Sequence, residues 1–259
     1  MKQIKTLVNV GIIIALYFLT YYLYTGYLHP LPLDSDSWDY HIPIAESILD
    51  GSFISRPNPS ILQKQYLGSI NVQNLPTWLH APLIRKLPQW YYPGSSEAIN
   101  AIFVFFHIPT FSNIFAAIVL FFVCWKLSLT FRLPTSYSLL FALTFSTLNV
   151  VLRWLNVVSI DVWVSIWFGL SIILFENPKK SLTYFVKLGF VLGMLIGSKY
   201  TTISFCATLF IFYVWNLIKY VNLPRFLAFL IPFSAVGLFW YIRNYLLMGN
   251  PIYPFSIWI

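Results

Sequence analysis

Long apolar stretches, separated by short polar connections, occupy most of this chain. Hydrophobic residues make up 58% of the 259 residues and charged residues 9%, with a mean hydropathy of +0.72. One soluble core of this length cannot bury so much apolar surface. Since a membrane-spanning helix needs about 20 mainly apolar residues, the sequence predicts an all-α, polytopic transmembrane bundle of about seven spans. We expect these spans at roughly residues 6–28, 110–130, 134–152, 161–176, 182–198, 201–219 and 224–242.

Local signals agree with these divisions. Pro134 and Pro224 can occupy first helical turns, where an N–H group has no partner within the helix anyway. Ser181 can cap the fifth stretch through its hydroxyl. The first stretch is too long for the core of a signal peptide and lacks a small-residue cleavage site, so we expect a membrane anchor.

Small residues inside the spans predict packing and not chemistry. Gly189, Gly193 and Gly197 recur every four residues and form a face on which another helix can pack closely. Cys124 and Cys206 fall within two predicted spans, so we expect small buried hydrophobic residues and no disulfide.

The charges predict an orientation. If Lys2 and Lys5 lie in the cytoplasm, the connections on that side carry almost the whole net charge of +8, as the positive-inside rule requires. The basic composition then follows from membrane topology, and nucleic acid binding is not indicated. Residues 29–109 become a long extracytoplasmic loop within a single transmembrane domain, residues 1–259. Apolar residues at helical spacing between Ile42 and Leu49 predict a helix on the membrane surface in this loop.

The start of the loop concentrates groups that can do chemistry. Asp34, Asp36 and Asp39 precede His41 within eight residues. Like-charged neighbours favour proton uptake by a carboxylate, which suits Asp36 to general-base work. The same cluster offers hard oxygen ligands and an imidazole, so a divalent cation such as Mg²⁺ or Mn²⁺ stays open as a cofactor. A solvated loop acid is the plain alternative.

Other charges collect at the outer ends of the predicted helices, namely Arg153, Asp161, Lys199 and Arg243. Together with the acidic loop they can line one outward-facing cavity. Each also has a structural explanation, since an acid complements a helix dipole and basic side chains anchor at lipid headgroups. The centres of the spans carry no charge, which makes ion-coupled transport the weaker interpretation.

Several short motifs resemble a known family when taken in order. They are Asp36-Ser-Trp-Asp-Tyr40-His41-Ile-Pro43, Tyr92-Pro93-Gly94-Ser-Ser-Glu97, Val-Ser-Ile-Asp161, Gly197-Ser-Lys199-Tyr200-Thr201, Arg243-Asn244 and Gly249-Asn250-Pro251-Ile-Tyr253-Pro254. The pattern resembles the GT-C glycosyltransferases, closest to bacterial proteins similar to protein O-mannosyltransferases and the lipid A aminoarabinose transferase.

The resemblance implies an integral membrane enzyme that takes a sugar from a polyprenyl-phosphate donor. It implies Asp36 as the catalytic base, with Glu97 and Asp161 as further cavity carboxylates. Lys199 and Arg243 become candidates for gripping the donor phosphate. Tyr40, His41 and Asn244 are expected to contact substrate, and Asp36, His41 and Glu97 are the candidate ligands if a metal ion is bound.

Partners and location follow from the same resemblance. The acceptor is expected to be a lipid, glycan or protein, and the location the plasma (inner) membrane of a prokaryote, in contact with membrane lipids. A typical family member has several more spans, so the resemblance covers this whole sequence but only the N-terminal portion of such a member, and a second chain supplying helices stays open. A transporter, lipid flippase or non-catalytic scaffold is the alternative.

Overall fold

The regular structure is helical throughout the described part of the chain. A computed structural model describes residues 36, 37, 41–55, 88–148, 151, 157–253 and 255, with isolated positions between 11 and 20. Its elements are α2 (Ile42–Asp50), η2 (Ser52–Ile54), η4 (Pro88–Tyr91), α5 (Glu97–Phe105), α6 (Phe111–Thr130), α7 (Thr135–Ser146), α9 (Asp161–Phe175), α10 (Leu182–Ile196), α11 (Thr202–Ile218), α12 (Leu223–Phe233), η5 (Ser234–Leu238) and α13 (Phe239–Met248). The predicted all-α class is confirmed for these residues.

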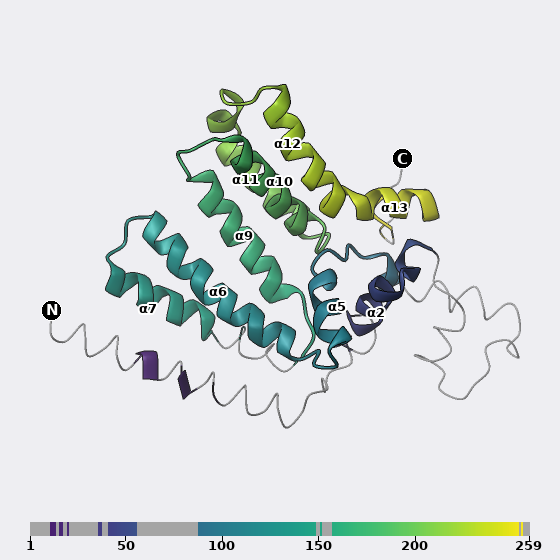
Figure 1. Cartoon of the computed structure of the whole chain (residues 1–259), viewed down its shortest axis with the longest axis horizontal. Coiled ribbons are helices and arrows are strands. Elements are labelled where there is room, and N and C mark those ends of the chain that lie inside the picture. The colour runs from purple at the N-terminus through teal and green to yellow at the C-terminus, as the bar shows by residue number, and fades with distance from the viewer. Residues whose placement is uncertain are drawn as a thin grey trace, which may run out of the picture.

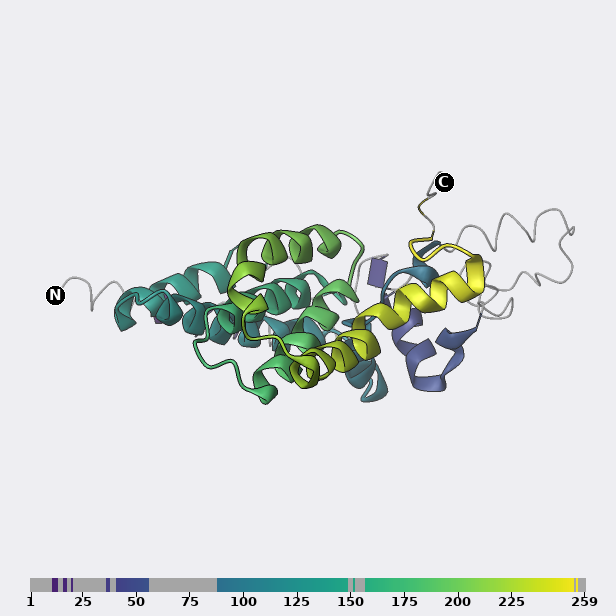
Figure 2. The same ribbon diagram turned by 90° about the horizontal axis from the view of Figure 1, so that it is seen from above.

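The long helices pack side by side, and the short ones gather at one end (Figure 1). α6 packs on α7 and α9, and α10 packs on α9 and α12. α2 and α5 pack on each other near the start of α6 and the start of α13. Seen from above, α7 and α13 lie at opposite ends of this helical body (Figure 2).

Local sequence signals set the helix starts. The Ser181 hydroxyl accepts a hydrogen bond from Tyr184 N at 3.2 Å, so the predicted cap of α10 is confirmed. Asn222 caps α12 in the same way, through Arg225 N at 3.1 Å. Pro232 lies inside α12, and the five π-helical residues of η5 follow it directly. The missing N–H of Pro232 would have bonded the carbonyl of Ala228, so the proline weakens the hydrogen-bond ladder one turn before the widened turn begins.

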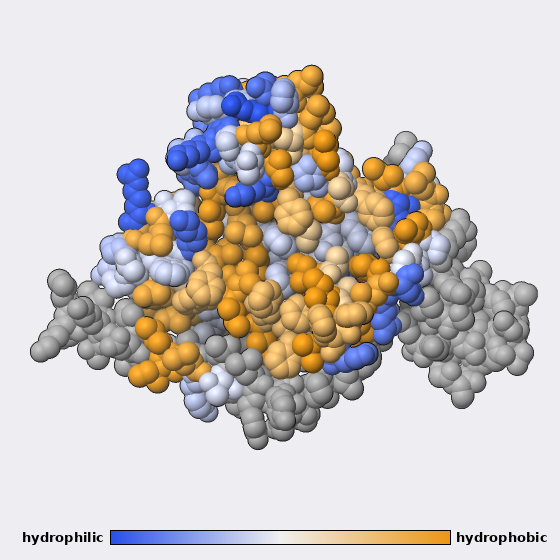
Figure 3. Space-filling view, in the orientation of Figure 1, coloured by the Kyte–Doolittle hydropathy of each residue, from blue (hydrophilic) through white to orange (hydrophobic). Residues whose placement is uncertain are grey.

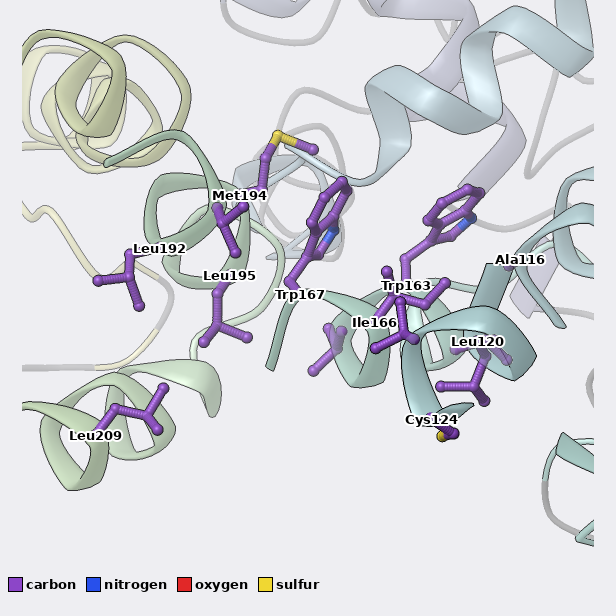
Figure 4. Close-up of a cluster of buried hydrophobic side chains, with 14 of the residues drawn as sticks. Ala116, Leu120, Cys124, Trp163, Ile166, Trp167, Leu192, Met194, Leu195 and Leu209 are labelled. Atoms are coloured by element: carbon purple, nitrogen blue, oxygen red, sulfur yellow. The ribbon is translucent and has the colours of Figure 1, made fainter. Parts of the chain in front are cut away.

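The apolar core lies between α6, α9, α10 and α11 (Figure 4). In this view α9 contributes Trp163, Ile166 and Trp167, with the α6 side chains on one side and those of α10 on the other. Both cysteines are buried and free. Their predicted role as small buried hydrophobic residues is confirmed, since Cys124 and Cys206 both belong to this core.

Close helix packing depends on the glycine face of α10. A Cβ atom at Gly189 would collide with the carbonyl oxygen of Phe229, and one at Gly193 would lie 3.1 Å from Phe233 Cα. Gly197 meets the carbonyl of Val236 in the same manner. The predicted small-residue face is therefore confirmed, and its partner is the α12–η5 segment.

Two helices in the described residues are long and apolar enough to cross a membrane, judged by length and composition. They are Phe111–Thr130 and the continuous Leu223–Met248, which joins α12, η5 and α13. α9, α10 and α11 are apolar but shorter, with 15, 15 and 17 residues. The first predicted span, 6–28, lies largely outside the described residues. An apolar surface covers much of one face, while hydrophilic residues gather at the end where α6 meets α7 and α11 meets α12 (Figure 3).

Replacing Gly189 by alanine tests the α10–α12 contact. Alanine favours a helix over glycine by about 1 kcal/mol, but the new Cβ would collide with the backbone of α12, and such overpacking costs about 1–3 kcal/mol. Because the collision is with backbone atoms, we expect the upper part of this range and a net loss of up to about 2 kcal/mol in the free energy of unfolding. Denaturation in detergent measures it. Val186→Ala, at an exposed position of the same helix, should change stability by less than about 0.5 kcal/mol; equal effects would refute this packing role.

Candidate functional site

A small pocket lies where the short helices meet the ends of the long ones. Its volume is about 130 Å³. It is lined by residues of α2, the loop before α5, the α9 entry, the α10–α11 connection and the C-terminal segment. These are Ile44, Tyr92, Pro93, Glu97, Ile160, Ser198, Lys199, Tyr200, Thr201 and Phe255. The structure thus brings Glu97 and Lys199, two residues singled out from the sequence, to one cavity.

The carboxylate of Glu97 is buried and paired. Its side chain is 2% exposed and accepts a short hydrogen bond from Nδ1 of His41, itself buried. The pair joins α2 to the first turn of α5, where a carboxylate also complements the helix dipole. A buried carboxylate needs such partners because its desolvation is costly.

A chain of polar side chains continues behind this pair. Asn100 donates to the second oxygen of Glu97 at 2.6 Å, and Ser112 donates to Asn100 Oδ1 at 2.5 Å. Trp163 Nε1 then donates to the Ser112 hydroxyl at 3.3 Å. All these side chains are buried. The network links α5, α6 and α9, and it fixes the orientation of Glu97 at the pocket wall.

Lys199 and Asp161 form an ion pair at the rim of the pocket. Lys199 Nζ lies 2.9 Å from Asp161 Oδ1, and both side chains are about half exposed, at 45% and 44%. Asp161 begins α9, and Ser159 supports it through its hydroxyl, which accepts from Asp161 N at 3.2 Å. An exposed pair of this kind contributes little to stability, so Lys199 can exchange its partner for another anion.

Asp36 is exposed, and the next residue fixes its position. The Ser37 hydroxyl donates to Val158 O at 3.2 Å and accepts from Val158 N at 2.8 Å. Val158 precedes Asp161 by three residues, so Asp36 lies at the same end of the molecule as the ion pair. Asp36 does not line the pocket itself.

Arg243 is almost completely buried and lies beside the pocket without lining it. Its Nε donates to Phe53 O, its Nη2 to Trp90 O at 3.1 Å, and its Nη1 to Asn244 Oδ1 at 3.1 Å. All three guanidinium nitrogens therefore donate to oxygen atoms of the protein.

Tyr200 connects Asn244 to the pocket wall. Its hydroxyl lies 2.9 Å from Tyr91 O and 2.6 Å from Tyr253 O, and it accepts from Asn244 Nδ2 at 2.8 Å. Burial raises the pKa of Tyr200, and the hydrogen bond from Asn244 opposes this effect. The hydroxyl therefore remains a hydrogen-bond donor at neutral pH.

Within the described residues, no group of three or more His, Cys, Asp or Glu side chains is arranged to hold a metal ion. Asp36, His41 and Glu97 thus do not form the ligand set expected from the sequence. His41 and Glu97 pair with each other, while Asp36 lies elsewhere at this end. Asp34, Asp39, Tyr40 and Arg153 lie outside the described residues.

Several residues of the site carry no role in the sequence prediction. Asn100 and Ser112 form the supporting network but have no motif that marks them. Tyr200 and Tyr92 fall inside the resembling motifs, so the motifs offered a signal for these two. Phe255 closes the pocket from the C-terminal segment, which only tertiary structure reveals.

No family model, curated protein or solved structure matches this chain.

Replacing Asn100 by alanine tests the buried network. It leaves one oxygen of Glu97 without the donor in Asn100 and the hydroxyl proton of Ser112 without its acceptor, so we expect a loss of about 2–3 kcal/mol in the free energy of unfolding. Asn177→Ala is the matched control, because this asparagine is exposed and accepts one bond from Lys179 N; it should cost less than about 1 kcal/mol. Chemical denaturation compares the two, and an Asn100 variant no less stable than the control would contradict the role of the network.

Proposed function

We propose that this protein is an integral membrane glycosyltransferase that moves a sugar from a polyprenyl-phosphate donor to an acceptor hydroxyl at the outer membrane face. The proposal is carried by one observation. Glu97 and Lys199 line the same pocket, and their direct partners His41 and Asp161 come from two other elements. Carboxylates and a cation around one small cavity suit a reaction that removes a proton and releases a phosphate.

The reaction assigns a role to each charge. Asp36 takes the proton of the acceptor hydroxyl as that oxygen attacks the anomeric carbon of the sugar. The bond from the anomeric carbon to the phosphate oxygen breaks, and its electron pair leaves with the polyprenyl phosphate. Lys199 compensates the charge on this leaving group. A direct displacement inverts the anomeric centre, and the fixed Glu97 orients the sugar through hydrogen bonds.

An apolar groove supports the choice of a lipid-linked donor. Its volume is about 460 Å³, and it runs between α2, α5, α10 and the η5–α13 segment. It is lined by Ile48, Phe53, Ser95, Ala98, Ile99, Phe190, Met194, Ala235, Val236, Phe239 and Trp240. Ser95 and Glu97, two residues apart, lie on the groove and on the pocket respectively. An isoprenoid chain in the groove can thus place its phosphate near the pocket.

The membrane arrangement belongs to the same proposal. We place the seven predicted spans in the inner membrane of a prokaryote, with the N-terminus in the cytoplasm. Large apolar side chains of α11 face outward, among them Ile211, Phe212 and Trp215, each more than 70% exposed. Lipid contact explains such exposure, which water would not favour. Lys179 and Lys219 lie at the opposite helix ends from Asp161 and Lys199, consistent with the positive-inside rule.

Transport, lipid flipping and a scaffold role have less support. α6, α9 and α11 carry no charged side chain in their central turns. A coupled transporter places ionisable groups near the bilayer midplane, whereas Asp161 begins α9, Lys199 follows the end of α10, and Arg243 lies in the last part of the continuous Leu223–Met248 helix.

Cysteine labelling tests the topology. Ser55 and Lys179 are both exposed, and in a variant without Cys124 and Cys206 each can be replaced by cysteine. We expect a membrane-impermeant maleimide to label Ser55→Cys in intact cells and Lys179→Cys only after the membrane is opened. The reverse pattern would overturn the orientation and the outer-face site with it.

Two single variants test the assigned roles, with purified protein and a panel of polyprenyl-phosphate sugars. Asp36→Asn keeps the shape but cannot accept the proton, so transfer should fall at least about a hundredfold while the affinity for polyprenyl phosphate is kept. Lys199→Ala should weaken that affinity about tenfold or more. Near wild-type turnover of Asp36→Asn would show that the base is assigned to the wrong residue, and absence of transfer from every donor would reject the function.

A further inference from the structure

Arg243 joins two chain segments that lie far apart in the sequence. Its Nε donates to the carbonyl of Phe53 in η2, and its Nη2 donates to that of Trp90 in η4. Trp90 Nε1 donates to Ser55 O at 3.3 Å, which links the same two segments directly. Both segments are thereby fixed to α13, the helix that carries Arg243.

The surroundings of the guanidinium favour its contacts within the protein over the binding of an anion. The side chain is 4% exposed, and its central carbon lies 5.7 Å from the ring centre of Tyr91 and 5.6 Å from that of Trp240. A planar guanidinium can stack on rings and donate from three nitrogens spread over a rigid fork, whereas an ammonium group donates from a single nitrogen. A phosphate bound to Arg243 would displace the carbonyl oxygens of Phe53 and Trp90, for which the described residues offer no other donor.

Asn244 extends the contact to the pocket. Its Nδ2 donates to Tyr91 O at 2.6 Å and to the Tyr200 hydroxyl at 2.8 Å. Tyr200 meets the ring of Tyr92 edge to face, with centres 5.9 Å apart, and both rings line the pocket. The aromatic wall formed by Tyr92 and Tyr200 therefore depends on hydrogen bonds from α13.

We infer that Arg243 and Asn244 are positioning residues. Their hydrogen bonds hold the segments around Phe53 and Trp90 against α13, a contact that we call the clasp, and so set the position of the Tyr92–Tyr200 wall of the pocket. Lys199, by contrast, meets the donor phosphate. The identity of the ligand rests on the proposed function; the clasp itself does not. Loss of the clasp should make the Tyr92–Tyr200 wall more mobile and slow turnover. The affinity for phosphate should not change, because Lys199 provides it.

Hydrogen exchange and ligand binding on the full chain in lipid nanodiscs test this inference. In Arg243→Lys, amide exchange in residues 51–55 and 90–94 should rise about tenfold. Turnover at saturating donor should fall about tenfold, whereas the Kd for a polyprenyl monophosphate should stay within about twofold. Lys199→Ala should give the opposite pattern, with a weaker Kd and unchanged exchange in both segments.

Two further variants separate the loss of the clasp from a general loss of folding. If Arg243→Lys does not fold, Asn244→Ala should show the same rise in exchange at residues 90–94. Methylguanidinium should restore turnover to Arg243→Ala, which a general loss of folding would not allow. A Kd weakened as strongly as in Lys199→Ala, with unchanged exchange, would make Arg243 a phosphate ligand and overturn the inference. If the wild-type chain binds no polyprenyl monophosphate, the proposed function fails, and the exchange pattern alone decides the clasp.

Discussion

The buried carboxylate of Glu97 is the constraint on which the site depends. A carboxylate with 2% exposure is stable only when its partners replace the hydration that it has lost. His41 reaches it from α2, and Asn100 from the next turn of α5. Ser112 in α6 donates to Asn100, and Trp163 in α9 donates to Ser112, so the hydrogen bonds that support Glu97 reach both long helices. One buried charge thus holds the short helices against the long ones at the end where the pocket lies.

Two further contacts complete that end of the molecule. Ser95 N donates to Gly197 O at 2.7 Å, which joins the entry of α5 to the end of α10 directly before Lys199. A side chain at Gly197 would collide with Ser95 Oγ, so the glycine makes this approach possible. Arg243 and Asn244 hold Trp90, Tyr91 and Tyr200 from α13. The rigid core of long helices therefore presents fixed groups at one end, while the Lys199–Asp161 pair is exposed enough to change partners.

Much of the fold follows from sequence patterns that act locally. Apolar runs and the Ser181 cap located α6, α9, α10 and α11 to within two residues, and the spacing of Gly189 predicted close packing. α7, Thr135–Ser146, is shorter than the predicted 134–152, and α5 was not predicted. The resemblance placed His41 and Glu97 in one candidate set of metal ligands, but their direct hydrogen bond joins positions 56 residues apart and follows only from tertiary packing. Arg243 illustrates the limit most clearly. The resemblance implied a phosphate contact for Arg243, whereas the structure pairs it with the side-chain oxygen of Asn244 and with two backbone carbonyls, which no side-chain pattern reveals.

A structure of the protein with a bound polyprenyl monophosphate is the most direct test of the central claim, that the pocket beside Lys199 receives the donor. The account predicts the phosphate within hydrogen-bond distance of Lys199 Nζ, with Asp161 displaced from the lysine and the isoprenoid chain in the apolar groove. A phosphate bound away from Lys199, with the Lys199–Asp161 pair intact at 2.9 Å, would contradict it.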